Sequence, residues 1–382
     1  MMNKREIKVL ATVILLLFGC LQAFADELII ESGMLRGELS GQQVFQIKGS
    51  KNLAGEIRIV SRQTEDIVIS FEKTARTSSK SESTRFLDLI DIKLDIRDDR
   101  ATLIILSPSQ APWEGSDYGV SLEVLVNLPE KMKIIGEINF MKFVVEGPFQ
   151  GIDLESTHSA LDIRRIYGSV TASTTHGDVT LHVIKGEIDI ETQNGGILAT
   201  DIIVPSGYAL FQTTDGAIKL TDIQGPVEAY TTHSSIEVKG IDAPDGSVVL
   251  RTSYGELTVY DITGELICET SYEPINITKA DINHGHSKIE TSHAPIFVDF
   301  LEISNSHVYI STEYSNVNLN CPADLSAKII AGVESGGRIH TRDLNLIPTV
   351  LNRTRLEAVA GDGESRIEVN IGGIGDITIL GQ

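Results

Sequence analysis

The sequence predicts an all-β protein: a right-handed parallel β-solenoid (β-helix) of about 18–21 residues per coil, with an N-terminal β cap region. Three observations predict this fold class. A short motif recurs at regular spacing, glycines mark turns at fixed places in each unit, and β-branched residues far outnumber aromatics, which make up 5% of the chain. A period near twenty residues is typical of solenoids, and right-handed crossovers are the general preference between parallel strands.

The recurring motif is Thr, any residue, then His, Asn, Asp or Tyr, usually Gly, one more residue, and an aliphatic. It is seen in Thr174–Val179, Thr192–Ile197, Thr213–Ile218 and Thr252–Leu257. The first aliphatics of successive units are Leu161, Val179, Ile197, Ile218, Ile236, Leu257, Ile275, Ile296 and Val317. Each step between neighbours in this series is either 18 or 21 residues, so the coils have two lengths.

The three extra residues of a long unit enter at one place. A Gly follows the first aliphatic by seven residues in the short units, as at Gly186, and by ten in three of the long units, as at Gly207. Insertions confined to one corner leave the inward-facing columns in register with the coils on either side. We therefore expect two strands per coil, with the length difference in the connection between them.

Residues 1–25 have the pattern of an export signal peptide. Basic residues precede the apolar run Val9–Phe18, and Ala23–Ala25 supplies small residues for cleavage before Asp26. A second interpretation stays open, because Leu17–Cys20 is similar to a bacterial lipobox, in which Cys20 is lipidated. We expect a protein exported to the periplasm or cell surface, with membrane contact only through a lipid anchor at Cys20 in the outer membrane if the second route applies.

Residues 26–135 are expected to form the N-terminal β cap, and residues 136–382 the solenoid repeats with a C-terminal cap. The candidate cap strands are Val44–Ile47, Glu56–Val60, Ile67–Glu72, Leu89–Ile96, Ala101–Leu106 and Val120–Leu128. Two loops are expected between them, a mobile one over residues 73–85 and a Pro-rich one over residues 107–119. We expect Trp113 in the second loop to pack down as a hydrophobic plug; a binding lip is the alternative.

The charge excludes some partners. The formal net charge of −21 repels phosphate backbones and anionic lipid, so nucleic-acid binding is not expected. Cys268 and Cys321 lie far apart in the repeat series, so a disulfide is not expected either. No phosphate loop, Ser elbow, zinc-protease helix motif or Cys redox pair is present, and we expect no catalytic residues, no metal and no cofactor.

Two side-chain columns follow from the register. The Thr column has the parity of inward residues and predicts a buried ladder of hydroxyl hydrogen bonds; a flat ice-binding face is the alternative. The next column, which we call the corner ladder, contains His158, His176, Asn194, Asp215, His233, Tyr254, Tyr272, His293 and Tyr314. It lies at a turn, where Asn, Asp and His tolerate left-handed backbone, and its tyrosines suggest ring stacking. A metal between His158 and His176 is a weaker alternative, because no regular third ligand appears.

A second group of histidines gives a possible binding corner. His286 and His307 each follow their unit's aliphatic by eleven residues, so they should lie side by side, and His284 is two residues from His286. Three imidazoles at one corner could hold Zn²⁺ or Cu²⁺ or titrate together near pH 6. Solvated corner histidines are the structural alternative.

The repeat style resembles that of a known group. Thr174–Leu181 and Gly186–Ile197, in an exported chain with a β-rich lead-in, are similar to the bacterial putative-adhesin domain family, a domain of unknown function similar to autotransporter adhesin head domains. The resemblance covers about residues 40–380, and the long units and the histidine corner depart from it. It implies adhesion and transfers no catalytic residues.

The sequence therefore predicts an exported, non-catalytic, adhesin-like binding or scaffolding protein of the bacterial cell envelope. Its expected partner is an unknown envelope protein or glycan. The alternatives are a carbohydrate-active β-helix enzyme and an envelope-sensing or regulatory partner protein. An enzyme would need carboxylates converging in a cleft over one face of the solenoid, whereas a flat, uninterrupted face favours binding.

Overall fold

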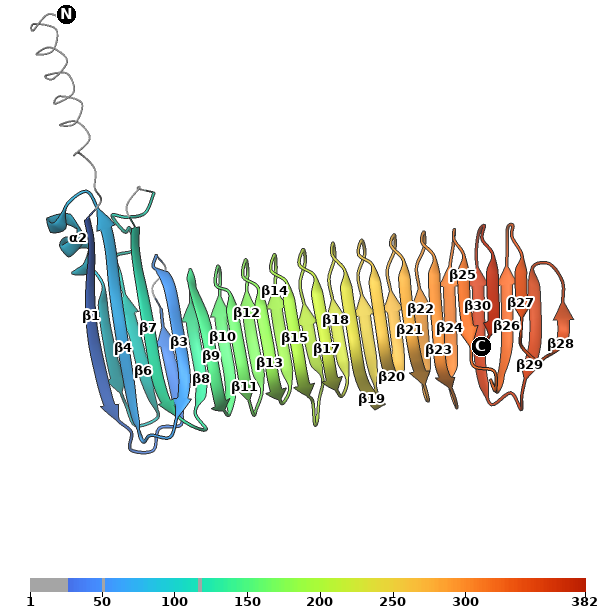
Figure 1. The fold of residues 1–382 in the computed structure, drawn as a ribbon, viewed down its shortest axis with the longest axis horizontal. Helices are drawn as coiled ribbons and strands as arrows, with labels where there is room; N and C mark the ends of the chain where they lie inside the picture. Colours follow the sequence, from blue (N-terminus) through green and yellow to red (C-terminus); the bar gives the residue numbers. More distant parts are fainter. Residues whose placement is uncertain (1–26, 50–51, 116–118) are drawn as a thin grey trace, which may run out of the picture.

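The structure is a computed structural model that describes residues 27–49, 52–115 and 119–382. The predicted signal peptide and the lipidation candidate Cys20 lie outside the described residues. The described chain is all-β, as the sequence predicts, and contains one helix that the sequence analysis did not predict. It forms a long rod whose strands stack side by side along its axis (Figure 1).

Most coils contribute one strand to each of two facing sheets, and each strand pairs in parallel with the equivalent strand of the next coil. The strands of the regular stack are β8 (Lys133–Ile138), β9 (Met141–Phe149), β10 (Gly151–Ser156), β11 (Leu161–Ile166), β12 (Val170–Thr174), β13 (Val179–Lys185), β14 (Ile188–Thr192), β15 (Ile197–Ile203), β16 (Ala209–Gln212), β17 (Ile218–Gln224), β18 (Val227–Tyr230), β19 (Ile236–Arg251), β20 (Leu257–Glu269), β21 (Ile275–Ile282), β22 (His286–Glu290), β23 (Ile296–Ile303), β24 (His307–Thr312) and β25 (Val317–Cys321). β19 and β20 run through the corner between the sheets and belong to both.

The pairing register changes where the sequence places the extra residues. Lys185 pairs with Ile203, which lies one short unit later in the chain, whereas Ile188 pairs with Ala209, which lies one long unit later. The additional residues therefore lie between Ile203 and Ala209, at the corner between β15 and β16. Every inward column keeps its alignment because the insertion bulges outward there.

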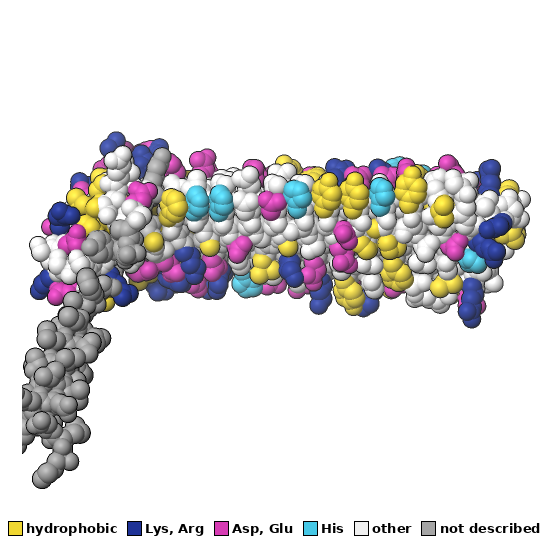
Figure 2. Space-filling model, turned by 90° about the horizontal axis from the view of Figure 1, so that it is seen from above, with side chains coloured by type: hydrophobic (Ala, Val, Ile, Leu, Met, Phe, Trp, Pro, Cys, Tyr) yellow, Lys and Arg dark blue, Asp and Glu magenta, His cyan; other side chains and the backbone are white. Residues whose placement is uncertain are grey.

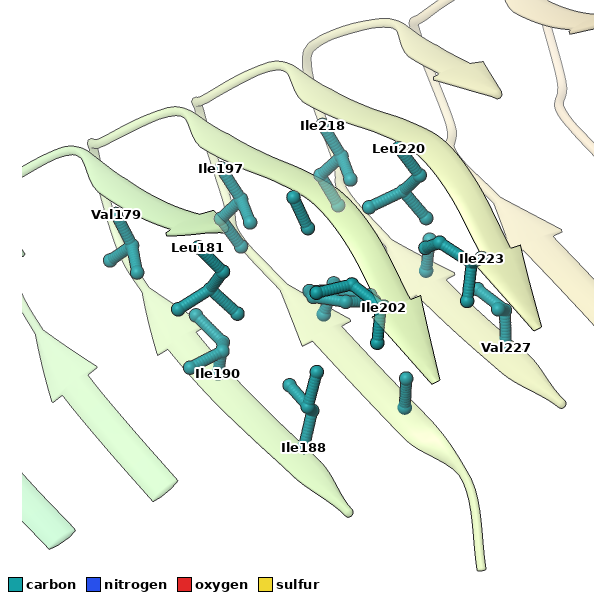
Figure 3. Packing of buried hydrophobic residues seen from close by; sticks show 14 of the residues in the cluster. Val179, Leu181, Ile188, Ile190, Ile197, Ile202, Ile218, Leu220, Ile223 and Val227 are labelled. Carbon is teal, nitrogen blue, oxygen red and sulfur yellow. The ribbon is translucent and has the colours of Figure 1, made fainter. Parts of the chain in front are cut away.

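The core is a set of aliphatic columns that run along the rod. Val179, Ile197, Ile218 and Ile236 occupy one column and are at most 1% exposed. Figure 3 shows this packing, with side chains from the two sheets meeting in the middle of each coil. Full burial of such a side chain stabilises the folded state by about 1.5–3 kcal/mol. Each coil is therefore held in place mainly by the aliphatic side chains of the coils on either side of it.

The Thr column is buried, but its hydrogen bonds differ from the expected chain of hydroxyls. Thr213 donates from Oγ1 to the carbonyl oxygen of Gly195 in the preceding coil at 3.0 Å, and accepts from the N–H of Gly216 at 3.1 Å. Thr192 makes the same two contacts: its Oγ1 donates to the carbonyl oxygen of Gly177 and accepts from the N–H of Gly195. Each Thr thus ties its own turn to the turn one coil earlier, which satisfies backbone groups that would otherwise be buried without partners.

The left-handed residues lie elsewhere than expected. No member of the corner ladder has a positive φ; instead, Asp201, Asp222 and Asp261 have φ of 57°, 55° and 61° in the middle of their strands. Gly240, at 68°, fills the same place in the coil between the last two. Asp and Gly are the residues that adopt this conformation at low cost. Arg165, Val183 and Lys279, with φ of 57°, 58° and 57°, occupy the same place in three other coils. The backbone therefore bends at this point in each coil from β11 to β21, whatever the residue, and the sequence interpretation missed this column.

The glycines of the corner turns are needed for close stacking. A Cβ on Gly195 would lie 1.9 Å from the carbonyl oxygen of Gly177, and a Cβ on Gly216 would lie 1.8 Å from that of Gly195. The turns of successive coils therefore approach closer than any side chain permits.

The N-terminal cap combines parallel and antiparallel pairing. Its elements are β1 (Glu27–Glu38), β2 (Val44–Lys48), β3 (Ala54–Arg62), β4 (Asp66–Thr77), α2 (Lys80–Leu87), β5 (Asp91–Ile96), β6 (Arg100–Leu106) and β7 (Gly119–Pro129). β2 and β3 continue the parallel stack onto β8 and β9, and β4 and β1 extend one sheet with antiparallel strands. β5 ends the other sheet as an antiparallel partner of β6.

The prediction of a mobile loop over residues 73–85 is wrong. β4 continues to Thr77, and α2 begins after Ser79, whose Oγ accepts a hydrogen bond from the N–H of Glu82. Ser79 and Glu82 have the spacing of a capping box, which is the signal that could have predicted this helix. Phe86 is buried at the end of the core.

Trp113 is the hydrophobic plug that the sequence predicts. It is 8% exposed, its Nε1 donates to the carbonyl oxygen of Asn52 at 2.9 Å, and its ring lies 5.7 Å from that of Phe86. It helps to close the end of the rod.

The C-terminal part consists of β26 (Ala327–Val333), β27 (Ile339–Arg342), β28 (Leu346–Leu351), β29 (Arg355–Ala360), β30 (Ser365–Ile371) and β31 (Ile377–Gly381). β28 and β29 form an antiparallel extension of the sheet at this end. β30 and β31 lie between the coil of β24–β25 and the coil of β26–β27 (Figure 1).

The Thr column generates the first testable prediction. Replacing Thr213 by Val removes the Oγ1 hydrogen bonds and leaves the carbonyl of Gly195 and the N–H of Gly216 without their partner. We expect the free energy of unfolding, measured by chemical denaturation, to fall by about 1–3 kcal/mol. Thr213→Ser keeps the hydroxyl and should lower the free energy of unfolding much less. Thr214→Val, at the partly exposed neighbouring position, should leave it almost unchanged. A Thr213→Val protein as stable as the wild type would contradict this role for the hydroxyl.

Candidate functional site

The corner ladder forms a continuous row of exposed side chains at one turn of each coil. Figure 2 shows this row running along the rod as a line of mostly yellow and cyan side chains. Ring centroids of successive members lie 4.5 Å apart for His158–His176, 5.5 Å for His233–Tyr254, 5.1 Å for Tyr254–Tyr272 and Tyr272–His293, and 5.4 Å for His293–Tyr314. The coil spacing brings the rings together because strands of a sheet lie about 4.8 Å apart.

The row contains two blocks of rings joined by polar residues. Asn194 donates from Nδ2 to the carbonyl oxygen of Thr175 at 3.3 Å, and Asp215 Oδ1 lies 2.8 Å from His233 Nδ1. Phe140 extends the first block, since its ring stacks on His158 at 4.5 Å. The sequence interpretation missed Phe140, although it precedes His158 by the length of one short unit.

The turn backbone beneath the ladder is fixed by hydrogen bonds between coils. The N–H of His176 donates to the carbonyl oxygen of Thr157, and the N–H of Tyr254 donates to that of Thr232, both at 3.0 Å. The side chains therefore project from a rigid base, which lowers the entropy lost when a ligand binds to them.

The stacking determines what the ladder can offer a ligand. Tyr254 lies between His233 and Tyr272 with interplanar angles of 7° and 1°, so both of its faces are covered. Its side chain is nevertheless 52% exposed, and Tyr272 and Tyr314 are 51% and 58% exposed. What remains accessible are ring edges, hydroxyls and imidazole nitrogens. A sugar needs an open ring face for stacking, whereas a protein surface can use edges and hydrogen-bonding groups.

The structure brings together two of the three histidines of the possible binding corner. His286 and His307 are direct neighbours on β22 and β24, and their rings lie 5.6 Å apart at 75°. His284 does not join them; its Nδ1 lies 2.7 Å from Oδ1 of Asn283. Within the described residues, no group of three or more His, Cys, Asp or Glu side chains is arranged to hold a metal ion.

Other residues complete this corner in a way that the sequence did not suggest. Because β30 lies beside β24, Arg366 becomes the next neighbour of His307, and Lys328 on β26 follows Arg366. Glu368 Oε1 lies 3.2 Å from His307 Nε2 and also pairs with Arg366. The corner therefore places the Arg366–Glu368 ion pair beside His307, while His286 stays exposed.

The three Asp residues of the left-handed column contribute to an acidic strip on another side of the rod. Asp201, Asp222, Asp242 and Asp261 line a shallow depression there. Farther along, burial raises the pKa of Asp281, and the carboxylates of Glu302 and Asp242 raise it further. Asp281 and Glu302 are direct neighbours on β21 and β23.

The two described cysteines have no chemical role at the surface. Cys268 and Cys321 are buried free thiols, and burial raises the pKa of Cys321 to about 12. Protonated, buried thiols are poor nucleophiles. Among the described residues, no helix has the length and apolar character needed to span a bilayer.

Comparisons with known proteins leave the family of this chain open. No family model and no curated protein matches the sequence. Two solved structures are similar at 12% sequence identity and a TM-score of 0.19: a putative cell adhesion protein from Clostridium sporogenes, with 93% of this chain and 100% of that chain covered, and a putative adhesin from Parabacteroides distasonis, with 91% and 97% covered. Similarity at these values says nothing about what this chain binds.

The acidic strip generates a prediction about pH. Because the pKa of Asp281 is raised on folding, its ionisation disfavours the folded state, and the stability that the protonated form provides is lost as pH rises from near 3.8 through the folded-state pKa. We expect Asp281→Asn to raise the melting temperature at pH 7 and to leave it unchanged at pH 3. Asp261→Asn, at an exposed position on the preceding coil, is the control. An equal effect of Asp281→Asn at both pH values would contradict this assignment.

Proposed function

We propose that this protein is an exported, non-catalytic, adhesin-like binding or scaffolding protein of the bacterial cell envelope, and that the corner ladder is its binding surface. The observation that carries the proposal is the exposed row of stacked rings on a backbone fixed between coils. Exposed aromatic side chains held in place are the residues that most often dominate binding energy at protein interfaces. The export signal and the resemblance of the repeats to the putative-adhesin domain family support the envelope location.

The geometry favours an envelope protein over a glycan as the partner. The faces of Tyr254 and Tyr272 are covered by their neighbours, which leaves edges and hydroxyls for contact. A partner that follows the rod would meet one group about every 4.8 Å. A flat sheet surface of a partner protein presents side chains at that spacing, because its strands also lie about 4.8 Å apart. The proposed protein has a right-handed coil and domain boundaries near residues 25 and 135.

A carbohydrate-active β-helix enzyme is the second candidate, because Asp201, Asp222 and Asp261 share one depression. Such an enzyme would use two of these carboxylates as acid and base or nucleophile. A sensing or regulatory role would use the corner ladder, as a scaffold would, and differs only in the identity of the partner.

The binding proposal is tested by removing the rings. The mature chain and a Tyr254→Ala/Tyr272→Ala variant are immobilised, and capture of envelope proteins is quantified for each. We expect the variant to weaken binding of the captured partner at least tenfold, since buried aromatic contacts at an interface contribute about 2 kcal/mol or more. Tyr208→Ala removes an exposed ring outside the ladder and should leave capture unchanged. Circular dichroism confirms that each variant is folded.

Two outcomes would overturn the proposal. Equal capture by the wild type and the Tyr254→Ala/Tyr272→Ala variant would remove the ladder as the binding surface. Hydrolysis of an envelope polysaccharide that is lost in Asp222→Asn and retained in the tyrosine variant would establish the enzyme instead.

A further inference from the structure

The order of strands at the C-terminal end departs from the rest of the rod. In the regular stack, each coil pairs with the next coil in the sequence. β24 and β25 instead pair with β30 and β31, and β26 and β27 pair with the opposite edges of the same two strands. The chain thus passes over one coil position, builds β26–β29, and returns to fill the position that it left open.

The returning segment satisfies strand edges on both of its sides. β30 pairs with β24 from His307↔Arg366 to Thr312↔Ile371, and with β26 from Ala327↔Ser365 to Val333↔Ile371. β31 is paired in the same way between β25 and β27. Within the described chain, no strand pairing joins β26–β29 directly to β24 or β25. The end unit is therefore attached to the rod by the segment 365–381 and by the connection over residues 322–326.

The open position selects for particular residues. Ile367, Val369 and Ile371 continue the inward aliphatic columns of the rod and are fully buried, as are Ile377 and Ile379. A segment without an aliphatic at every second position would leave these columns unfilled and expose the core.

The turn between β30 and β31 selects for glycine. A Cβ on Gly375 would lie 2.0 Å from the carbonyl oxygen of Ser315. A Cβ on Gly372, three residues earlier, would meet only the Cγ of Glu313 at 3.9 Å, an ordinary contact. Glycine is therefore required at position 375 but not at position 372.

Polar contacts add further selection. Asp376 Oδ1 accepts from the N–H of Arg338 at 2.7 Å, and the N–H of Asp376 donates to Asn316 Oδ1 at 2.8 Å. On β30, Glu368 Oε1 lies 3.2 Å from Nε2 of His307 on β24. These contacts reach both flanking coils and match this particular segment.

We propose that the gap between the coil of β24–β25 and the coil of β26–β27 is a strand-binding site for residues 365–381, and that the same segment of a second copy of this chain can occupy it. The contacts are identical whichever copy supplies the strands, which is the condition for domain swapping. Addition of extended strands to open sheet edges is an established mode of peptide recognition. The link over residues 361–364 contains Gly361 and Gly363 at φ of 57° and 75°, so it can change direction at little cost.

Exchange would join two rods through their C-terminal ends. This adds to the proposed binding role a means of doubling the length of the surface, and it does not depend on that role.

The test uses two variants of the chain from residue 26 onward, each with one added cysteine, that crosslink only across an exchanged interface. Ser311 and Asn370 are direct neighbours on β24 and β30. A Ser311→Cys protein and a differently tagged Asn370→Cys protein are mixed, warmed to just below the unfolding transition, cooled, and treated with a short thiol crosslinker. The native Cys268 and Cys321 are buried. We expect a covalent heterodimer on a denaturing gel.

A matched pair provides the control. Glu290 is the direct neighbour of Ser311 on its other side, within the regular stack. A mixture of Glu290→Cys and Ser311→Cys proteins should therefore give at least tenfold less heterodimer. The Ser311→Cys/Asn370→Cys double variant should crosslink within one chain, which shows that the chosen positions react.

Two further donors test the selectivity of the site. Adding Gly375→Ala to the Asn370→Cys copy should abolish the heterodimer, because the added Cβ would clash with the carbonyl oxygen of Ser315. Adding Gly372→Ala should leave it unchanged. If the Asn370→Cys mixture gives no more heterodimer than the Glu290→Cys mixture while the double variant crosslinks fully, the segment is not exchanged and the proposal is overturned.

Discussion

The structure depends on one constraint, the parallel alignment of each coil with its neighbours. Successive backbones lie about 4.8 Å apart, so any residue placed in a column meets the residue at the same position in the coils above and below. Inside the rod, aliphatic side chains meet this requirement, because Val179, Ile197 and Ile218 pack on one another in one buried column. At the tight turns, only glycine lets neighbouring backbones approach this closely, and at the corner, flat rings can stack at this spacing. The same rule that builds the core therefore also builds the exposed ladder.

This constraint explains why much of the fold could be predicted. The alternation between short and long units requires that the extra residues lie outside the paired columns, and the pairing offset does change between Ile203 and Ala209. The neighbours in the corner ladder also follow from the spacing of the units. Phe140 follows from it as well, because it precedes His158 by one short unit, but it lies before Leu161, where the series of aliphatics begins.

Other features could not be predicted because they depend on contacts that spacing does not encode. A parallel stack shows that a strand needs a neighbour, but not which one. Nothing in the residues after Val317 therefore indicated that β30 would lie against β24, or that Arg366 would neighbour His307. The hydroxyl of a buried Thr can bond to another Thr or to backbone, and only the turn geometry selects the carbonyl of the preceding coil. The left-handed backbone at Asp201 and Asp222 lies within strands, where Asp is not expected.

The functional account rests on the accessibility of the ladder to a partner, and hydroxyl-radical footprinting of the mature chain tests this most directly. Oxidation of tyrosines is measured with and without an envelope protein fraction. Tyr254, Tyr272 and Tyr314 lie in the ladder, whereas Tyr167 and Tyr208 are exposed elsewhere on the same rod. The account predicts that the fraction protects the three ladder tyrosines and leaves the other two unchanged. Protection of Tyr167 and Tyr208 with unchanged oxidation of the ladder would contradict it.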